Sequence, residues 1–455
     1  MLQGDWSSDV CSSDLALKNG SFIVRLSAIV FGLGCLVHKQ IAKGILYLTS
    51  EILLIVYMVQ TGFYNLSKFR TLGDVEQQKV WNEAKSLYEY VDGDRSLIIL
   101  LYGIVTLSLI LVFFLIAKSS LKQAYRLECQ SKKGEQILTL KQELKELLNG
   151  NLPITLLTFP VLGVLMFTIL PLVFMISMAF TNYSVEGNKL VLFDWVGLEN
   201  FRKIFDFGDS LGQTFWSVFG WTMVWAVVAT FSNYILGMLL ALFINWKEIR
   251  AKKMWRFCFA LTVAIPHFVT LLIIKSMLQP EGAVNILLRN LGLIGATQSL
   301  PFFTDATWAR VVVILINIWV GVPYTLLQVT GILQNIPTEL YEAARVDGAG
   351  PIVTFMKITL PYMLFVTTPY LITTFTGNVN NFNVIFLTTE GLPRSVGSTA
   401  GKTDLLITWL YKLTIENQYF DVGAVVGIMT FVTLTIVSLV TFTFSGSNRN
   451  EEAFR

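Results

Sequence analysis

Long runs of apolar residues alternate with short polar segments along most of this chain. A helix needs about 20 residues to cross the roughly 30 Å hydrocarbon core of a membrane. The runs of that length predict eight membrane-spanning helices, at residues 44–63, 97–117, 154–180, 215–245, 257–278, 308–332, 358–386 and 421–444. A further run, residues 22–37, is shorter and contains Arg25, which favours a re-entrant or interfacial segment.

The amino-acid composition agrees with an all-α integral membrane protein. The 455 residues are 54% hydrophobic and 14% charged, with a mean hydropathy of +0.60, whereas soluble domains carry roughly 25% charged residues. A net charge of +3 gives no reason to expect a nucleic-acid partner. Four cysteines without a C-x-x-C pair, and two histidines, predict neither a disulfide framework nor a metal site.

Basic residues are concentrated on one side of the predicted spans. Residues 118–150 contain seven Lys or Arg residues and the turn 246–256 contains five. Because basic loops stay in the cytoplasm, this side, together with both termini, is predicted to be cytoplasmic. Within 118–150, the stretch "ILTLKQELKELL" predicts an amphipathic helix on the membrane surface.

The first residues do not follow the pattern of the rest. "GDWSSDVCSSDL" (residues 4–15) repeats Ser-Ser-Asp and matches the translation of a common sequencing adapter, so residues 1–15 are interpreted as an artefact; an ordinary polar tail is the alternative. The remaining chain is expected to form an N-terminal region, 16–150, with two spans and a cytoplasmic amphipathic linker. A six-helix core, 151–445, with a cytoplasmic loop at 333–357, and a cytoplasmic tail, 446–455, are expected to follow.

One cytoplasmic segment, "LYEAARVDGAGP" (residues 340–351), differs in character from its apolar neighbours. Pro337 suits a first helical turn, and the residues after it are good helix formers. Asp347 and Gly348 should end that helix, since glycine permits a positive φ, and Pro351 can open the next one. The result is a helix–turn–helix joined rigidly to the seventh span, built either for a partner to grip or as a surface hairpin without one.

The spacing within this segment resembles a known family signature. Glu342, Ala343 and Ala344 are followed by three residues, Gly348, nine residues and then "ITLP" (358–361). This is similar to the EAA motif of permeases from binding-protein-dependent ABC transporters. The resemblance implies that the loop is a coupling helix that docks on a cytoplasmic ATPase, with Glu342 in polar contact, Ala343 and Ala344 allowing close approach, and Asp347-Gly348 making the turn.

Other stretches extend the resemblance over most of residues 150–445. "FTNYS" (180–184), "WVGLENFRKIF" (195–205), "NIWVGVPY" (317–324) and "AGKTDLLITWLY" (400–411) are together similar to the larger membrane subunit of maltose/maltodextrin transporters. Some members carry a large folded domain between spans three and four. Here that loop is only residues 181–214, so contacts made by such a domain are not expected.

Spans six and seven are unusually polar for membrane helices. Polar groups in a bilayer are costly and face a bundle interior or a water-filled path. Spacing of i, i+4, i+7 places three residues of each span on one helical face: Asn317, Gly321 and Tyr324, and Thr374, Asn378 and Asn381. Two such faces suit a pocket for an uncharged, hydroxyl-rich ligand; hydrogen bonding between helices without a ligand is the alternative. The resemblance implies that these six positions bind sugar.

The resemblance implies a non-catalytic permease subunit of an ATP-driven importer of maltose or maltodextrin, spanning a bacterial plasma membrane several times. Its partners would be a second permease subunit, an ATPase dimer that binds ATP and Mg²⁺, an extracellular sugar-binding protein and membrane lipid; the chain itself would hold no cofactor or metal. The same machine could carry another oligosaccharide or glycerol phosphate. An ion-coupled transporter is a further alternative, for which Glu51 is the one fitting intramembrane acid.

One glycine-rich segment resembles a nucleotide-binding motif but lacks a required residue. "GSTAGKT" (397–403) resembles a phosphate-binding loop, but the required first glycine falls on Val396, and the segment is predicted to lie outside the cell. The resemblance implies instead that this loop reaches toward the external binding protein.

Overall fold

The computed structural model describes residues 13–83, 85, 87–134, 137, 142, 145, 152–246 and 248–444. Its contacts divide the chain into two compact units, Met1–Gly197 and Leu198–Arg455, which are described separately. The division falls one spanning helix after the expected boundary at residue 150.

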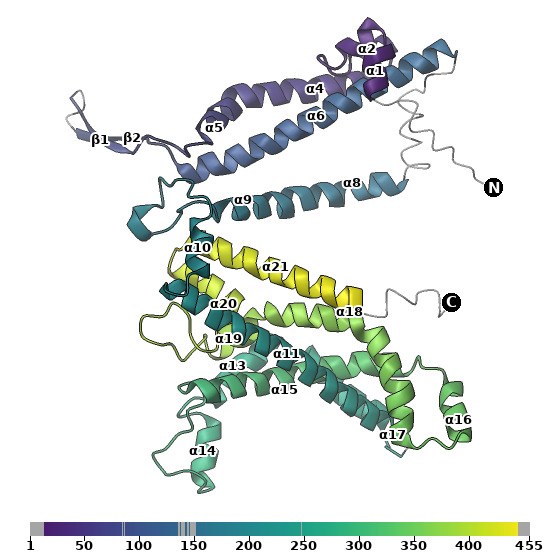
Figure 1. Ribbon diagram of the computed structural model, residues 1–455, viewed down its shortest axis with the longest axis vertical. Coiled ribbons are helices and arrows are strands. Elements are labelled where there is room, and N and C mark those ends of the chain that lie inside the picture. Colours follow the sequence, from purple (N-terminus) through teal and green to yellow (C-terminus); the bar gives the residue numbers. More distant parts are fainter. Residues whose placement is uncertain are drawn as a thin grey trace. The chain divides into compact units, whose positions relative to one another are not determined.

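The first unit is helical with one hairpin (Figure 1). Its elements are α1 (Ser13–Asn19), α2 (Phe22–Leu26), α3 (Leu33–Val37), α4 (Ile41–Tyr57), the π-helical turn η2 (Met58–Gly62), α5 (Phe63–Lys68), β1 (Gln78–Asn82), β2 (Leu87–Val91), α6 (Ser96–Lys132), α8 (Leu152–Val164), η3 (Leu165–Ile169), α9 (Leu170–Met178) and the short η4 (Glu186–Asn188).

The second unit is helical throughout the part that the structure describes. Its elements are α10 (Glu199–Phe205), α11 (Ser210–Asn245), α12 (Lys252–Ala264), α13 (His267–Met277), α14 (Ala283–Asn290), α15 (Ala306–Leu333), α16 (Thr338–Val346), α17 (Pro351–Thr354), η5 (Phe355–Thr359), α18 (Leu360–Val379), α19 (Phe382–Thr388), α20 (Leu406–Tyr411), η6 (Lys412–Glu416) and α21 (Phe420–Phe444).

The described residues contain seven helices long and apolar enough to cross a membrane, and an eighth span if the bent pair α12–α13 is counted as one. These spans fall on the eight predicted apolar runs, so the predicted all-α membrane architecture is confirmed. Continuous helices include Ile41–Lys68, Ser96–Lys132 and Ser210–Asn245.

The fifth predicted span, 257–278, is not one straight helix. Helices α12 and α13 meet at 86°. Ile265 is extended (φ −75°, ψ 128°) because a residue before proline is driven away from the helical region, and Pro266 has no N–H to continue the helix. The apolar run predicted the position of this span correctly, but it did not predict the bend.

The cytoplasmic linker is described only in part. Residues 118–132 continue α6 rather than forming a separate surface helix. Most of the predicted amphipathic stretch "ILTLKQELKELL" lies outside the described residues.

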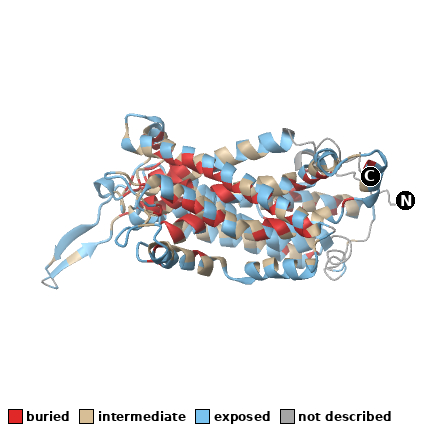
Figure 2. Cartoon of the chain, turned by 90° about the horizontal axis from the view of Figure 1, so that it is seen from below, coloured by how far each residue is buried: buried red, intermediate tan, exposed pale blue. Residues whose placement is uncertain are grey.

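The hairpin β1–β2 was not expected from the sequence. Gln78 pairs with Val91 and Asn82 with Leu87 in antiparallel register. It extends past the ends of α5 and α6 and is largely exposed (Figures 1 and 2). Such two-stranded ribbons are marginal on their own, so the contacts at its base matter.

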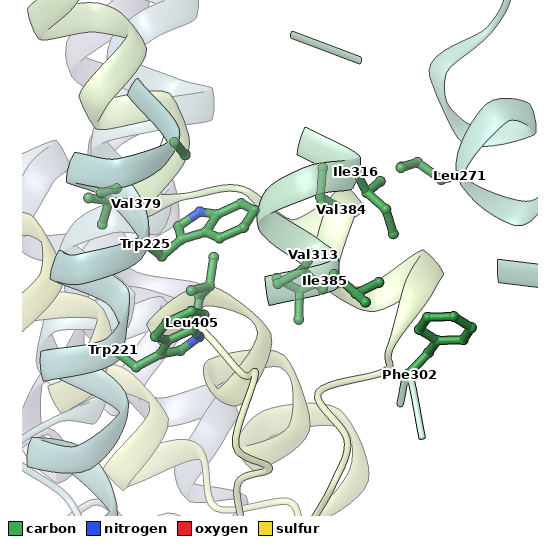
Figure 3. Packing of buried hydrophobic residues seen from close by; sticks show 13 residues of the cluster. Trp221, Trp225, Leu271, Phe302, Val313, Ile316, Val379, Val384, Ile385 and Leu405 are labelled. Carbon is green, nitrogen blue, oxygen red and sulfur yellow. The ribbon is translucent and has the colours of Figure 1, made fainter. Parts of the chain in front are cut away.

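The core of the second unit lies where α11, α15 and α19 pack together. Trp225 of α11, Val313 of α15 and Ile385 of α19 are buried in one cluster, shown in Figure 3. Side-chain caps fix where these helices begin: Asp209 accepts from the N–H of Leu211, and Asp305 accepts from two N–H groups of α15. This packing places the polar faces of α11, α15 and α18 against one another.

Candidate functional site

The amides predicted on spans six and seven meet within the second unit. Asn381 Nδ2 donates to Asn317 Oδ1 at 3.4 Å and to Asn378 Oδ1 at 3.5 Å. Asn317 and Asn378 are both buried, each 6% exposed. The predicted convergence of the two faces is therefore found at these three positions, which we call the amide cluster.

Helix α11 contributes a third face that the sequence analysis missed. Asn378 Nδ2 donates to Thr230 Oγ1 at 3.0 Å, and Trp225 Nε1 donates to the Asn378 carbonyl at 3.0 Å. One turn farther along α11, Tyr234 hydroxyl lies 2.8 Å from Thr367 Oγ1. These polar residues recur at helical spacing inside an apolar run, and that recurrence was the signal available in the sequence.

Gly321 serves the contact between α11 and α15. A Cβ at this position would lie 2.2 Å from Asn233 Nδ2 on α11, so glycine leaves room for the amide of Asn233 where the two helices meet. Thr325, one turn on, lies 3.1 Å from the hydroxyl of Tyr370. Gly321 therefore lies at a contact between α11 and α15.

Two predicted residues are less enclosed. Tyr324 is 45% exposed and Thr374 is half-buried. Tyr324 lies on the same face of α15 as Asn317, nearly two turns closer to the 333–357 loop. The six predicted positions therefore differ in burial: the asparagines make hydrogen bonds within the cluster, whereas the phenol of Tyr324 is exposed.

One amide of the cluster and a further amide on α11 retain unused hydrogen-bonding capacity. Asn317 Nδ2, in the cluster, and Asn233 Oδ1, outside it, are buried without a hydrogen-bond partner among the described residues. Leaving a buried polar group unsatisfied costs about 1–3 kcal/mol, which a hydroxyl ligand or water supplying a donor and an acceptor would recover. The amides of the cluster thus bond between helices, and Asn317 Nδ2 has no partner among the described residues.

The EAA segment folds as helix α16 followed by a glycine turn. Gly348 has φ +76°, and the N–H of Ala349 donates to the carbonyl of Ala344 at 2.8 Å, which closes the helix end. Tyr341 hydroxyl lies 3.1 Å from Thr359 Oγ1, tying α16 to η5. Since α17, η5 and α18 run on without a break, α16 is attached directly to the helix that carries Asn378.

The exposed side of α16 differs in one respect from expectation. Glu342, Ala343 and Asp347 are exposed, whereas Ala344 is buried, so Ala343 alone of the two alanines offers open surface. Val346 and Ile352, at 88% and 77% exposure, add apolar surface beside the turn.

The glycine-rich segment 397–403 belongs to a compact loop built around a buried ion pair. Asp404 and Lys412 approach to 2.7 Å with side chains 0% and 7% exposed. Asp404 also accepts from the N–H of Gly401 and the hydroxyl of Thr408, and Thr403 bonds back to the Leu392 carbonyl. An isolated antiparallel bridge between Arg394 and Gly401 joins the two sides of this loop, and no strand of a phosphate-binding fold precedes it among the described residues.

The predicted intramembrane acid has a structural partner. Glu51 is 8% exposed and accepts a hydrogen bond from the N–H of Phe31 at 2.8 Å. Glu51 lies on α4, so this hydrogen bond connects the turn before α3 to α4 in the first unit.

Comparison with known proteins defines the class. Residues 233–449 match the family described as the binding-protein-dependent transport system inner membrane component. The bacterial alginate ABC importer, solved by crystallography, has a similar fold: TM-score 0.53 at 22% identity, covering 68% of this chain and all of that chain. The fold and the EAA segment together define a membrane-spanning ABC importer permease.

Sequence relatives make the assignment more specific. The chain is 34% identical to the galactooligosaccharides transport system permease protein GanP of Bacillus subtilis, over 94% of this chain and 99% of that protein. It is 35% identical to the maltodextrin transport system permease protein MdxF of the same species, over 94% and 96%. Escherichia coli MalF is 36% identical over 54% of this chain and 48% of its own. The chain belongs to the family of binding-protein-dependent inner membrane permeases.

Proposed function

We propose that this permease forms half of the pathway for a maltodextrin-type oligosaccharide in an ATP-driven importer. The observation that carries the proposal is the amide cluster, where Asn317, Asn378 and Asn381 meet on adjacent membrane helices. Amides, a phenol and hydroxyls present donors and acceptors without net charge, which suits sugar hydroxyls. The maltodextrin permeases among the relatives support this substrate class.

The chain itself acts without catalysis in this proposal. A separate ATPase dimer binds ATP and Mg²⁺ and docks on α16 through Glu342, Ala343, Asp347 and the apolar side chains of Val346 and Ile352. Movement of α16 passes to α18 through the unbroken α17–η5–α18 connection and the Tyr341–Thr359 contact. The amide cluster then opens to one side of the membrane and closes to the other.

The proposal also includes an orientation, taken from the distribution of basic residues, and two further partners. Both termini and the basic segments lie in the cytoplasm. A second permease subunit completes the pathway, and an extracellular sugar-binding protein delivers substrate; a neighbour of similar fold, at 21% identity, was solved with an alginate-pentasaccharide-bound periplasmic protein.

Uptake by the reconstituted complex tests the proposal with a matched pair of amide variants. Asn378→Ala removes the bonds to Thr230 and Asn381, whereas Asn380→Ala removes an exposed amide two positions away. We expect Asn378→Ala to lower ATP-dependent uptake of radiolabelled maltotriose at least tenfold, and Asn380→Ala to leave it within twofold. Normal uptake by an assembled Asn378→Ala complex contradicts the proposal.

A second candidate substrate is a galacto-oligosaccharide, favoured by the equally extensive similarity to GanP. Both sugars are neutral and hydroxyl-rich, so the amide cluster suits either one. Competition of galactobiose and maltotriose for uptake separates them, because the true substrate class competes at the lower concentration.

A further inference from the structure

A hollow lies in the second unit, away from the amide cluster. It has a volume of about 420 Å³ and is bounded by the end of α13, the segment 299–304 before α15, and residues 388–392, which begin at the last residue of α19. In the proposed orientation this is the external end of the unit. Ligand pockets in proteins commonly measure about 300–1,000 Å³, so the hollow is large enough for one or two sugar rings.

Two of its walls are joined by hydrogen bonds from side chains of α14. Asn285 is fully buried; its Nδ2 donates to the Gln279 carbonyl at 3.0 Å and its Oδ1 accepts from the N–H of Leu300 at 2.9 Å. Arg289 adds bonds to the carbonyls of Pro280 and Gln298. The end of α13 and the 299–304 segment are therefore held at a fixed separation.

The third wall is fixed by the buried ion pair of the glycine-rich loop. Lys412, paired with Asp404, also donates to the Glu390 carbonyl at 2.7 Å. Thr389 hydroxyl lies 2.8 Å from that of Thr403. All three walls are thus preorganised, which lowers the entropic cost of binding a ligand between them.

The lining indicates a neutral ligand. Its charged residues, Lys275 and Glu390, have opposite signs and contact each other, so the hollow offers no unpaired charge to an anion or a cation. The lining also contains Gln279, whose side chain makes no hydrogen bond to described residues, and the hydroxyls of Ser299 and Thr304. Phenylalanine, proline and leucine side chains supply the apolar remainder.

We propose that this hollow is an external carbohydrate subsite that holds the end of the oligosaccharide before it reaches the amide cluster. The inference rests on the proposed function for the class of ligand. Helix α19 links the two sites: Asn381 caps its start, and Thr388, its last residue, lines the hollow. Seven residues at 1.5 Å per residue separate them by about 10 Å, roughly two sugar rings.

Photoaffinity labelling of the reconstituted complex with a diazirine-bearing maltotriose tests the proposal. We expect label on peptides containing 275–280, 299–304 and 388–392, displaced by unlabelled maltotriose. Ser299→Trp should fill the hollow and reduce this labelling at least fivefold while label near 374–381 persists. Gln279→Ala should raise the uptake KM several-fold with little change in kcat, and Asn290→Ala, an exposed amide on α14 outside the lining, should change neither.

The possible outcomes separate this inference from the proposed function. Labelling near 374–381 without displaceable labelling of the hollow overturns the subsite alone. Crosslinking that shows a segment of the binding protein filling the hollow also overturns it. Absence of maltotriose uptake and of labelling at both places overturns the proposed substrate, and the subsite with it.

Discussion

At the scale of single residues, Gly348 has the most specific backbone requirement in the coupling segment. Its φ of +76° lies in the left-handed region, and a Cβ there would meet nothing within 4 Å. The demand for glycine is therefore conformational rather than steric. Gly350, two residues on, has φ −71° and equally open surroundings, so it is a matched control.

We expect Gly348→Ala to reduce sugar uptake several-fold, because a side chain in the left-handed region costs roughly 1–2 kcal/mol and shifts the end of α16. Gly350→Ala should leave uptake nearly unchanged. Membrane insertion of both variants should be normal by cell fractionation. Equal uptake by the two variants shows that the turn at Gly348 is not needed for coupling.

Asp94 acts at the scale of an element, since it holds the base of the hairpin β1–β2. Its carboxylate contacts Lys68 at 2.5 Å and Tyr64 hydroxyl at 2.8 Å, and it accepts from the N–H groups of Asp74 and Val75. The ammonium of Lys68 and these donors hold the pKa of Asp94 well below its usual range. The ionised carboxylate is thus part of the fold.

Acid should loosen the hairpin base. Because the folded pKa of Asp94 is depressed, its stabilising contribution is present above its unfolded pKa of about 3.9 and is lost as pH falls through the folded value. We expect Asp94→Asn to reproduce this loss at neutral pH and to lower hydrogen-exchange protection of the Val75 amide at least tenfold. Asp92→Asn, an exposed neighbour, should not. Full protection in Asp94→Asn contradicts this role.

The buried ion pair between Asp404 and Lys412 also stabilises an element, since it holds the loop between α19 and α20 in place. Breaking a buried pair by removing one partner costs about 3–5 kcal/mol, whereas exposed pairs contribute about 1 kcal/mol or less. We expect Lys412→Met to lower the unfolding midpoint in detergent markedly. Glu199→Gln, which breaks an exposed pair with Lys203 at 3.7 Å, should change it little. Similar midpoints for the two variants rule out this role of the pair.

At the scale of the whole molecule, the driving force for transport separates two classes of machine. Glu51 is the intramembrane acid that an ion-coupled mechanism would use, yet it is occupied by the N–H of Phe31. Glutamine keeps an acceptor for that bond, so we expect Glu51→Gln to retain more than half of wild-type uptake. Uptake should stop on ATP depletion and survive a protonophore in ATP-loaded vesicles; the reverse pattern means ion coupling.

Much of the fold could be predicted because its signals are local. The length of each apolar run sets the number of spans, and Pro337, Gly348 and Pro351 set the ends of the coupling segment. The bend at Pro266 was missed because proline permits a bend without fixing its angle. The hairpin was missed because residues 78–91 carry no clean apolar–polar alternation, and its base depends on Asp94 reaching Lys68 across 26 positions.

By itself, the sequence determined which segments enter the membrane, where the EAA segment lies and that spans six and seven carry polar faces. Those properties follow from composition and helical period within single segments. Only the tertiary structure decided what these faces touch: Asn378 meets Thr230 from 148 positions away, and Asn381 meets Asn317 from 64. Such contacts depend on how α11, α15 and α18 pack, and a one-dimensional pattern does not encode which helix will supply the partner.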